Sequence, residues 1–169
     1  MTVFNDMQKE YPNRALIILG VSIGLTTVLD ITGVFTNCWI SDGQNCTGIV
    51  PFDSSGPVWL AATSWMMFIS VGVAVVMIAL YFVIVIEVLK LGYHITIRKR
   101  LIFIRLLAVL YLFLIVISIL VFLPNVGSYK NSEMWNQAGW SCWLTIISIV
   151  GIGLVELFGQ LVQRQCIAT

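Results

Sequence analysis

The sequence predicts an all-α membrane protein, built as a bundle of four transmembrane helices. Hydrophobic residues make up 59% of the chain and charged residues only 10%, which is too apolar a composition for one soluble core to enclose. Four apolar stretches are long enough to cross a hydrocarbon core, which takes about 20 helical residues. They cover residues 15–35, 58–86, 101–123 and 142–162, and none alternates like a membrane β-strand.

The rest of the chain is too short for a separate soluble domain. Its 169 residues leave only short connections and tails outside the four stretches, so we expect a single domain, residues 1–169. A polar leader precedes the first stretch, which runs past the length of a signal peptide without a cleavage site. We therefore expect this stretch to remain as the first helix.

The distribution of basic residues predicts the orientation, because Lys and Arg in short loops stay on the cytoplasmic side of a membrane. The first connection, residues 36–57, has no Lys or Arg, and the third has only Lys130. The others precede the first stretch, fill the second connection or follow the fourth stretch: Lys9, Arg14, Lys90, Arg98, Lys99, Arg100 and Arg164. Both termini are therefore expected in the cytosol, and the first connection on the luminal or extracellular side.

Two cysteines lie in that first connection, Cys38 and Cys46. In an oxidising compartment, at a spacing that can close a small ring, they are expected to form a disulfide, with two free thiols as the alternative. Asn45 begins an Asn-Cys-Thr sequon and is a candidate for N-glycosylation. Cys142, between two tryptophans at the start of the fourth stretch, is expected to be a packed small residue.

Ionisable residues inside apolar stretches are costly and usually face protein or water. Arg105 and Glu156 lie at similar depths, roughly 7 and 12 Å inside the cytosolic edge, which predicts an ion pair between the last two helices. The alternative is that Arg105 alone extends towards the headgroups. Glu87 is expected at a solvated helix end near Lys90.

Asp30 lies near the luminal third of the first stretch, without a cation at comparable depth. Hydroxyl groups could solvate its carboxyl group within the bundle. The candidates are Thr26, Thr27, Thr63 and Ser64. Alternatively, Asp30 contacts a donor on another membrane protein.

Other residues are further candidates for contacts or modification. Gly20 and Gly24 form a GxxxG motif that suits close helix packing, within the bundle or against a partner. The third connection carries three side chains typical of binding anchors, Tyr129, Met134 and Trp135. Cys166, just past the fourth stretch, is a candidate for lipidation, although an unmodified tail is the simpler expectation.

Four short motifs stand at the ends of the apolar stretches. They are Cys38-Trp39 with Cys46, the phrase 59–67 (WLAATSWMM), Phe122-Leu123-Pro124 closing the third stretch, and Ala138-Gly139-Trp140 opening the fourth. In these motifs the chain resembles the claudin-like tetraspan superfamily. That superfamily includes claudins, the peripheral myelin protein group and auxiliary subunits of glutamate-receptor and calcium channels. The resemblance covers most of the chain and implies the four-helix fold.

The chain also departs from the claudin pattern. Claudins place a Gly-Leu-Trp motif before the first Cys and use a longer first loop to build a small extracellular sheet, whereas here Trp39 follows Cys38. Thr63 stands where many claudins have an Arg. The chain thus resembles a divergent, short-loop member, such as the nematode claudin-like type, for which we expect little extracellular sheet.

The sequence offers no catalytic motif, so we expect neither enzyme activity nor a cofactor. His94 is the only histidine, and no metal-ligand cluster or phosphate-binding loop accompanies it. The basic run 98–100 is explained by topology and anionic lipids, so we expect no nucleic acid and no small-molecule substrate. Intramembrane acids can serve transport, but these helices lack further polar groups lining a path.

Two functions agree with these observations. In the first, the protein is an accessory subunit in the plasma membrane, which changes the assembly, trafficking or gating of a larger channel or receptor. In the alternative, it is a claudin-like junction component that associates with itself through extracellular loops. The short first connection and the absence of a claudin-type hydrophobic carboxyl end favour the accessory role.

Overall fold

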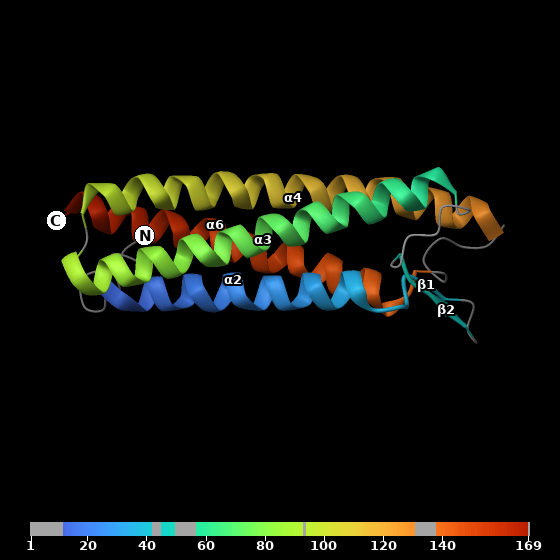
Figure 1. Cartoon of the computed structure of the whole chain (residues 1–169), viewed down its shortest axis with the longest axis horizontal. Helices are drawn as coiled ribbons and strands as arrows, with labels where there is room; N and C mark the ends of the chain where they lie inside the picture. Colours follow the sequence, from blue (N-terminus) through green and yellow to red (C-terminus); the bar gives the residue numbers. More distant parts are fainter. Residues whose placement is uncertain (1–11, 42–44, 50–56, 93, 131–137, 169) are drawn as a thin grey trace.

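Four long helices dominate the part of the chain that the structure, a computed structural model, describes (Figure 1). The described residues are 12–41, 45–49, 57–92, 94–130 and 138–168. The helices are α2 (Pro12–Phe35), α3 (Val58–Leu91), α4 (Ile95–Lys130) and α6 (Trp140–Ala168). All four are long and apolar enough to cross a membrane, which confirms the predicted fold class and makes this a multi-pass membrane protein.

Each helix extends beyond the apolar stretch that predicted it. The α4 helix is the clearest case, because it begins five residues before Arg100 and ends at Lys130, so the prediction that Phe122-Leu123-Pro124 closes this helix is wrong. Pro124 lies inside α4, although it lacks the N–H that a helix interior uses. Beside it, the Asn125 side chain donates a hydrogen bond to the carbonyl oxygen of Val121 at 2.7 Å.

Local sequence explains where several helices begin and end. Pro12 occupies the first turn of α2, where its missing N–H costs nothing. At the other end of a helix, Gly92 terminates α3 with a φ of 71° and donates its N–H to the carbonyl oxygen of Val88 at 3.0 Å. This left-handed conformation favours glycine, so α3 stops here and the chain turns back into α4.

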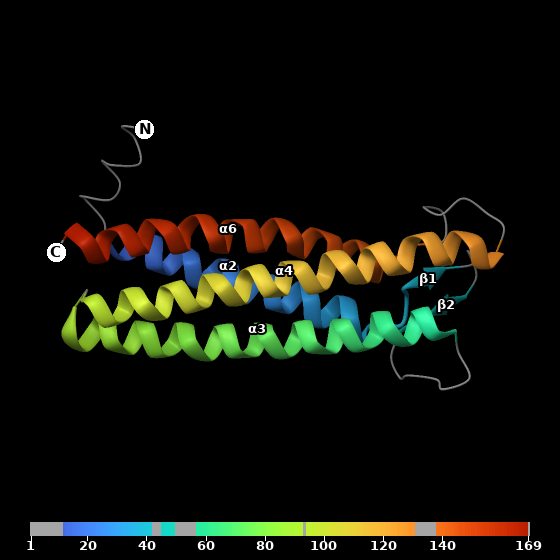
Figure 2. The same cartoon turned by 90° about the horizontal axis from the view of Figure 1, so that it is seen from above.

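The helices pack as an elongated bundle in which α2 lies chiefly against α6, and α3 chiefly against α4 (Figures 1 and 2). The beginning of α2 and the end of α6 lie at the same end of the bundle, together with the turn between α3 and α4. We call this the basic end, because the run 98–100 lies there. The core between the helices holds large enclosed side chains such as Leu19, Met77 and Ile104.

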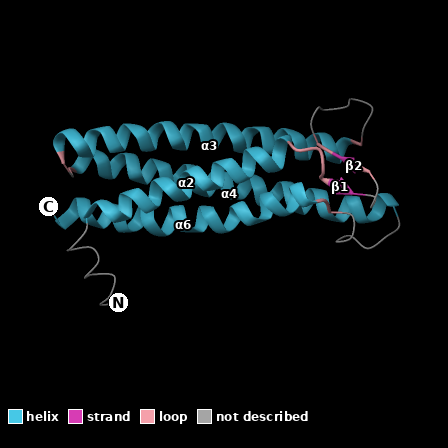
Figure 3. Ribbon diagram, turned by 90° about the horizontal axis from the view of Figure 1, so that it is seen from below, coloured by secondary structure: helices cyan, strands magenta, loops and turns pink. Residues whose placement is uncertain are grey.

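A small antiparallel ribbon lies at the opposite end, which we call the capped end (Figure 3). It pairs β1 (Ile40–Ser41) with β2 (Cys46–Thr47), with Ile40 opposite Thr47. A single bridge joins Ile40 to Ala138, just before α6. The described residues of the first connection thus form a sheet of two-residue strands, which agrees with the expectation of little extracellular sheet.

Candidate functional site

Trp39 is the anchor of the capped end. Its side chain is completely enclosed, and its indole N–H donates a hydrogen bond to the Gly33 carbonyl oxygen at 2.6 Å. The Trp39 ring packs edge-to-face on the Phe122 ring of α4, with 5.1 Å between the ring centroids. The Trp59 ring of α3 also packs edge-to-face on Phe122, at a centroid distance of 5.9 Å. Trp39 therefore joins α2 to α4, and Trp59 brings α3 to the same phenylalanine.

Cys38 and Cys46 are joined by a disulfide, which confirms the predicted pairing. Gly139 fixes this bonded segment to the start of α6, because its N–H donates to the Trp39 carbonyl oxygen at 2.8 Å. A Cβ atom at position 139 would collide with the carbonyl group of Cys38. Only glycine allows this approach, which gives a physical reason for the Ala-Gly-Trp motif.

The predictions for Asn45 and Cys142 also concern the capped end. The Asn45 side chain is exposed, next to the disulfide, so a glycosyltransferase would not have to displace other side chains to reach it. Cys142 is a free, fully buried cysteine, in the packed position expected for it. Thr63 is buried as well and donates to the carbonyl oxygen of Trp59.

Asp30 lies in the centre of the bundle, with no exposed surface. Ser70 of α3 donates a hydrogen bond to Asp30 Oδ2 at 3.0 Å, and the hydroxyl of Tyr111 from α4 lies beside the same carboxyl group. Tyr111 also donates to Ser148 of α6 at 3.3 Å. Four helices thus converge on one buried polar centre, and this burial favours solvation of Asp30 within the bundle over its contact with another membrane protein.

The partners of Asp30 differ from the four hydroxyl residues named from the sequence. A hydroxyl group does contact the carboxyl group of Asp30 within the bundle, but Ser70 supplies it. Thr27 and Thr63 instead donate to carbonyl oxygens of their own helices. Depth along an apolar stretch does not reveal which face of a neighbouring helix turns inwards, so the sequence could not select Ser70.

The two glycines of the GxxxG motif have different surroundings. A Cβ at Gly20 would collide with the Tyr81 ring of α3, so Gly20 serves packing inside the bundle. A Cβ at Gly24 would meet no atom within 4 Å, so this position faces open space. Only Gly24 of the pair remains a candidate for contact with a partner.

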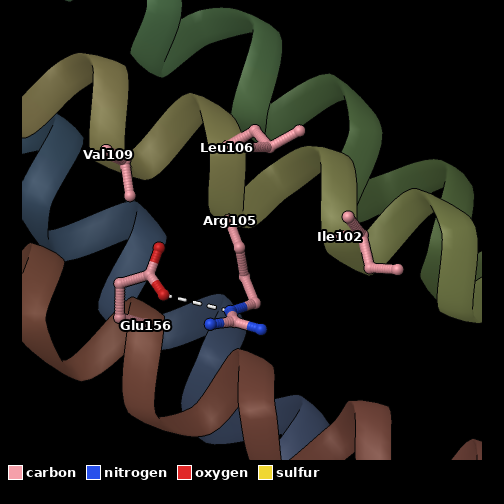
Figure 4. Close-up of a pocket in the computed structure, with 5 residues that line it drawn as sticks. All are labelled: Ile102, Arg105, Leu106, Val109 and Glu156. Carbon is pink, nitrogen blue, oxygen red and sulfur yellow. Dashed lines mark hydrogen bonds and ion pairs between the residues drawn. The ribbon is translucent and has the colours of Figure 1, made fainter.

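The structure brings Arg105 and Glu156 together near the basic end (Figure 4). Arg105 Nε lies 3.0 Å from Glu156 Oε2, and the two side chains are 30% and 25% exposed. Arg105 also donates from Nη1 to Gln163 Oε1 at 3.1 Å. The pair lies in a cleft between α4 and α6 whose other walls are Ile102, Leu106 and Val109. Gln163 was not singled out from the sequence, although its position seven residues after Glu156 places it on the same face of α6.

A second ion pair closes the turn between α3 and α4. Glu87 Oε1 lies 2.7 Å from Arg100 Nη1, and both side chains are partly exposed. The sequence placed Glu87 at a solvated helix end near Lys90, but its partner is Arg100, because the turn at Gly92 folds α4 back along α3. Only the tertiary fold creates this contact.

Several predicted sites lie outside the described part of the chain. Met134 and Trp135 belong to the third connection, which the structure does not describe. The backbones of Tyr129 and Cys166 belong to α4 and α6, but their side chains are not described. Among the described residues, no group of three or more His, Cys, Asp or Glu side chains could hold a metal ion.

Comparison with known protein families assigns the chain to a family. A family model described as tight junction protein, claudin-like, matches residues 7–166, which is nearly the whole chain. Searches of curated proteins and of solved structures found no match. The matched range contains α2, α3, α4, all but the last two residues of α6, and the disulfide-bonded cap. The chain therefore belongs to the claudin-like family of tight junction proteins.

Proposed function

We propose that this protein is a non-enzymatic accessory subunit, which docks beside a larger channel or receptor in the plasma membrane and changes its assembly, trafficking or gating. The observation that carries the proposal is the structure of the capped end. Its ribbon has strands of two residues each, and its tryptophan points into the bundle. The described part of the cap therefore presents little surface for adhesion between cells.

The sides of the bundle offer a different kind of surface. Gly24 faces open space on α2, and the partly exposed Arg105–Glu156 pair lines a cleft between α4 and α6. Polar groups and small residues at membrane depth are the features by which transmembrane helices associate. Lateral contact within one membrane is thus better supported than contact across the gap between two cells.

Affinity purification from native membranes, followed by quantitative mass spectrometry, tests the accessory role. We expect one channel or receptor in fixed stoichiometry with this chain. Gly24→Leu should reduce its recovery, whereas Gly72→Leu is the matched control, because position 72 is equally open but lies on α3. Recovery of no other membrane protein in fixed ratio would contradict the proposal.

The alternative function is a junction component, and the family description favours it. It predicts continuous lines of the protein at borders between two expressing cells, and none where an expressing cell meets a non-expressing one. Substitution of Tyr129, Met134 and Trp135 by alanine would disperse those lines. The accessory role predicts no such dependence on the neighbouring cell.

The proposed orientation places the basic end in the cytosol, with both chain termini, and the capped end outside. The basic run 98–100 and Arg164 support this assignment by their charge. If Asn45 carries a glycan, peptide N-glycosidase should increase the gel mobility of the wild type but not of Asn45→Gln. Antibody access to tags at either terminus only after permeabilisation tests the orientation independently of the glycan. Access in intact cells would contradict it.

A further inference from the structure

The basic end carries more positive charge than its acidic side chains balance. Among the described residues, seven basic side chains lie there against two acidic ones. The basic residues are Arg14, Lys90, Arg98, Lys99, Arg100, Arg105 and Arg164, and the acidic ones are Glu87 and Glu156. Both acids already contact a cation, since Glu87 pairs with Arg100 and Glu156 with Arg105. The excess charge attracts the anionic headgroups of a membrane surface.

The cleft between α4 and α6 lies near this charge and has apolar walls (Figure 4). Ile102, Leu106 and Val109 form the walls, and all three side chains are exposed. Arg105 lines the cleft and donates from Nε and Nη1 to side chains of α6. Its other terminal nitrogen, Nη2, has no acceptor among the described residues. The cleft thus combines a surface for an acyl chain with a donor for an oxygen atom.

Two further cations flank the cleft at its basic end. Arg98 precedes Ile102 by four residues, so it lies on the same face of α4, one turn nearer the basic end. On α6, Arg164 follows Glu156 by eight residues, about 12 Å along the helix axis. Because α4 and α6 run in opposite directions (Figure 2), both cations lie beyond the Arg105–Glu156 pair at similar depth. Neither makes an ion pair with another described residue.

We propose that this cleft binds one anionic phospholipid, with the phosphate group between Arg98 and Arg164 and one acyl chain along the apolar walls. The order of groups in the cleft matches the lipid from head to tail. Arg105 Nη2 lies deeper than the two cations, where it can donate to an ester carbonyl oxygen of the same lipid. A lipid with a zwitterionic headgroup has the same chain and esters, but its own positive charge opposes the two arginines, so the site favours a net negative headgroup.

The identity of the basic residue distinguishes this site from a general attraction between the run 98–100 and anionic lipids. Lys99 is exposed and carries the same charge as Arg98, but it lies about 100° further around α4, away from the face that Arg98 shares with Ile102. A general attraction predicts equal losses when either cation is removed. The site predicts that the loss at position 98 is larger.

Native mass spectrometry of the full chain tests this prediction, with the protein released from phosphatidylcholine nanodiscs that contain a minor fraction of phosphatidylserine. We expect the wild type to retain one phosphatidylserine molecule in preference to phosphatidylcholine. Arg98→Gln should weaken this retention about tenfold or more, because it removes a charged hydrogen bond to phosphate. The matched control Lys99→Gln should weaken it about fivefold at most, as expected for one basic residue near an anionic surface. Equal effects would overturn the proposed phosphate position.

A second pair of variants tests the acyl chain without changing any charge. Val109→Trp should fill the cleft and abolish the preferential retention. The matched control is Val75→Trp on α3, since the side chains of Val109 and Val75 are 55% and 53% exposed, so neither substitution should disturb the core. Undiminished retention by Val109→Trp, or equal losses in both variants, would overturn the proposed chain position.

The wild type provides the last check on the lipid site. If it retained phosphatidylserine no better than phosphatidylcholine, the site as a whole would be refuted. The accessory role would be unaffected, because its test concerns Gly24 on α2 and the recovery of a different protein.

Discussion

The two ends of the bundle differ in how far their key side chains are enclosed. At the capped end, Trp39 is fully enclosed, and the Cys38–Cys46 disulfide cross-links the connection between α2 and α3. At the basic end, the side chains of Arg105 and Glu156 remain 30% and 25% exposed. The cap is closed by contacts within one chain. The basic end instead holds polar groups that lipid or protein can still reach. The two ends therefore differ in how tightly they are closed, and substitutions at each end can test this difference.

Trp39→Ala should cause the largest loss of stability. It removes a fully buried ring together with its hydrogen bond to Gly33, and substitutions of this kind cost about 3–5 kcal/mol. Thermal unfolding of the purified protein in detergent measures the effect. Trp140→Ala is the matched control, since that side chain is 52% exposed and surface substitutions usually change stability by about 0.5 kcal/mol or less. Equal losses would show that the cap is not anchored by Trp39.

Gly139→Ala should be the next most harmful, because the added Cβ collides with the backbone carbonyl of Cys38. Backbone atoms cannot rotate away, so we expect a loss of about 1–3 kcal/mol in unfolding free energy. Gly24→Ala introduces the same methyl group into open space on α2 and should be neutral or stabilising. If both variants unfolded at the same temperature, the close approach of α6 to the cap would be refuted.

Arg105→Leu tests the basic end. It leaves Glu156 without its charged donor. Because the pair is partly exposed, we expect a loss of about 1–2 kcal/mol, between the values for exposed and buried pairs. The double variant Arg105→Leu/Glu156→Leu should recover most of this loss. A double variant no more stable than Arg105→Leu would mean that the two residues are not coupled. The folded fraction in detergent is a suitable readout.

Asp30→Asn should have the smallest effect, below about 1 kcal/mol, because asparagine keeps the volume and an acceptor for Ser70. Asp30→Ala should cost more, since it leaves a gap and removes the acceptor of the Ser70 hydrogen bond. Complexes purified from native membranes should be the same for Asp30→Asn as for the wild type, given that the residue is enclosed. A changed set of partners would show that Asp30 becomes accessible in another conformation.

Much of this architecture could be predicted from residue order. The length of the apolar stretches predicted the four helices, and the predicted disulfide between Cys38 and Cys46 is present. The prediction for the end of α4 failed because Pro124 is accommodated within the helix. Ser70 and Gln163 were missed as partners of Asp30 and Arg105, since a helix that is hydrophobic all round gives no periodic signal for its inward face.

The sequence by itself determined the class of protein. Exposing so much apolar surface to water would cost too much free energy, so the chain must be placed in a membrane. It also determined where helices could span and which cysteines could pair. Only the tertiary structure decided that Trp39 closes the cap, that Asp30 is enclosed between the helices and that Arg105 contacts both Glu156 and Gln163. These features depend on how far each helix is rotated about its own axis. Packing between the helices sets that rotation, whereas the length of an apolar stretch does not.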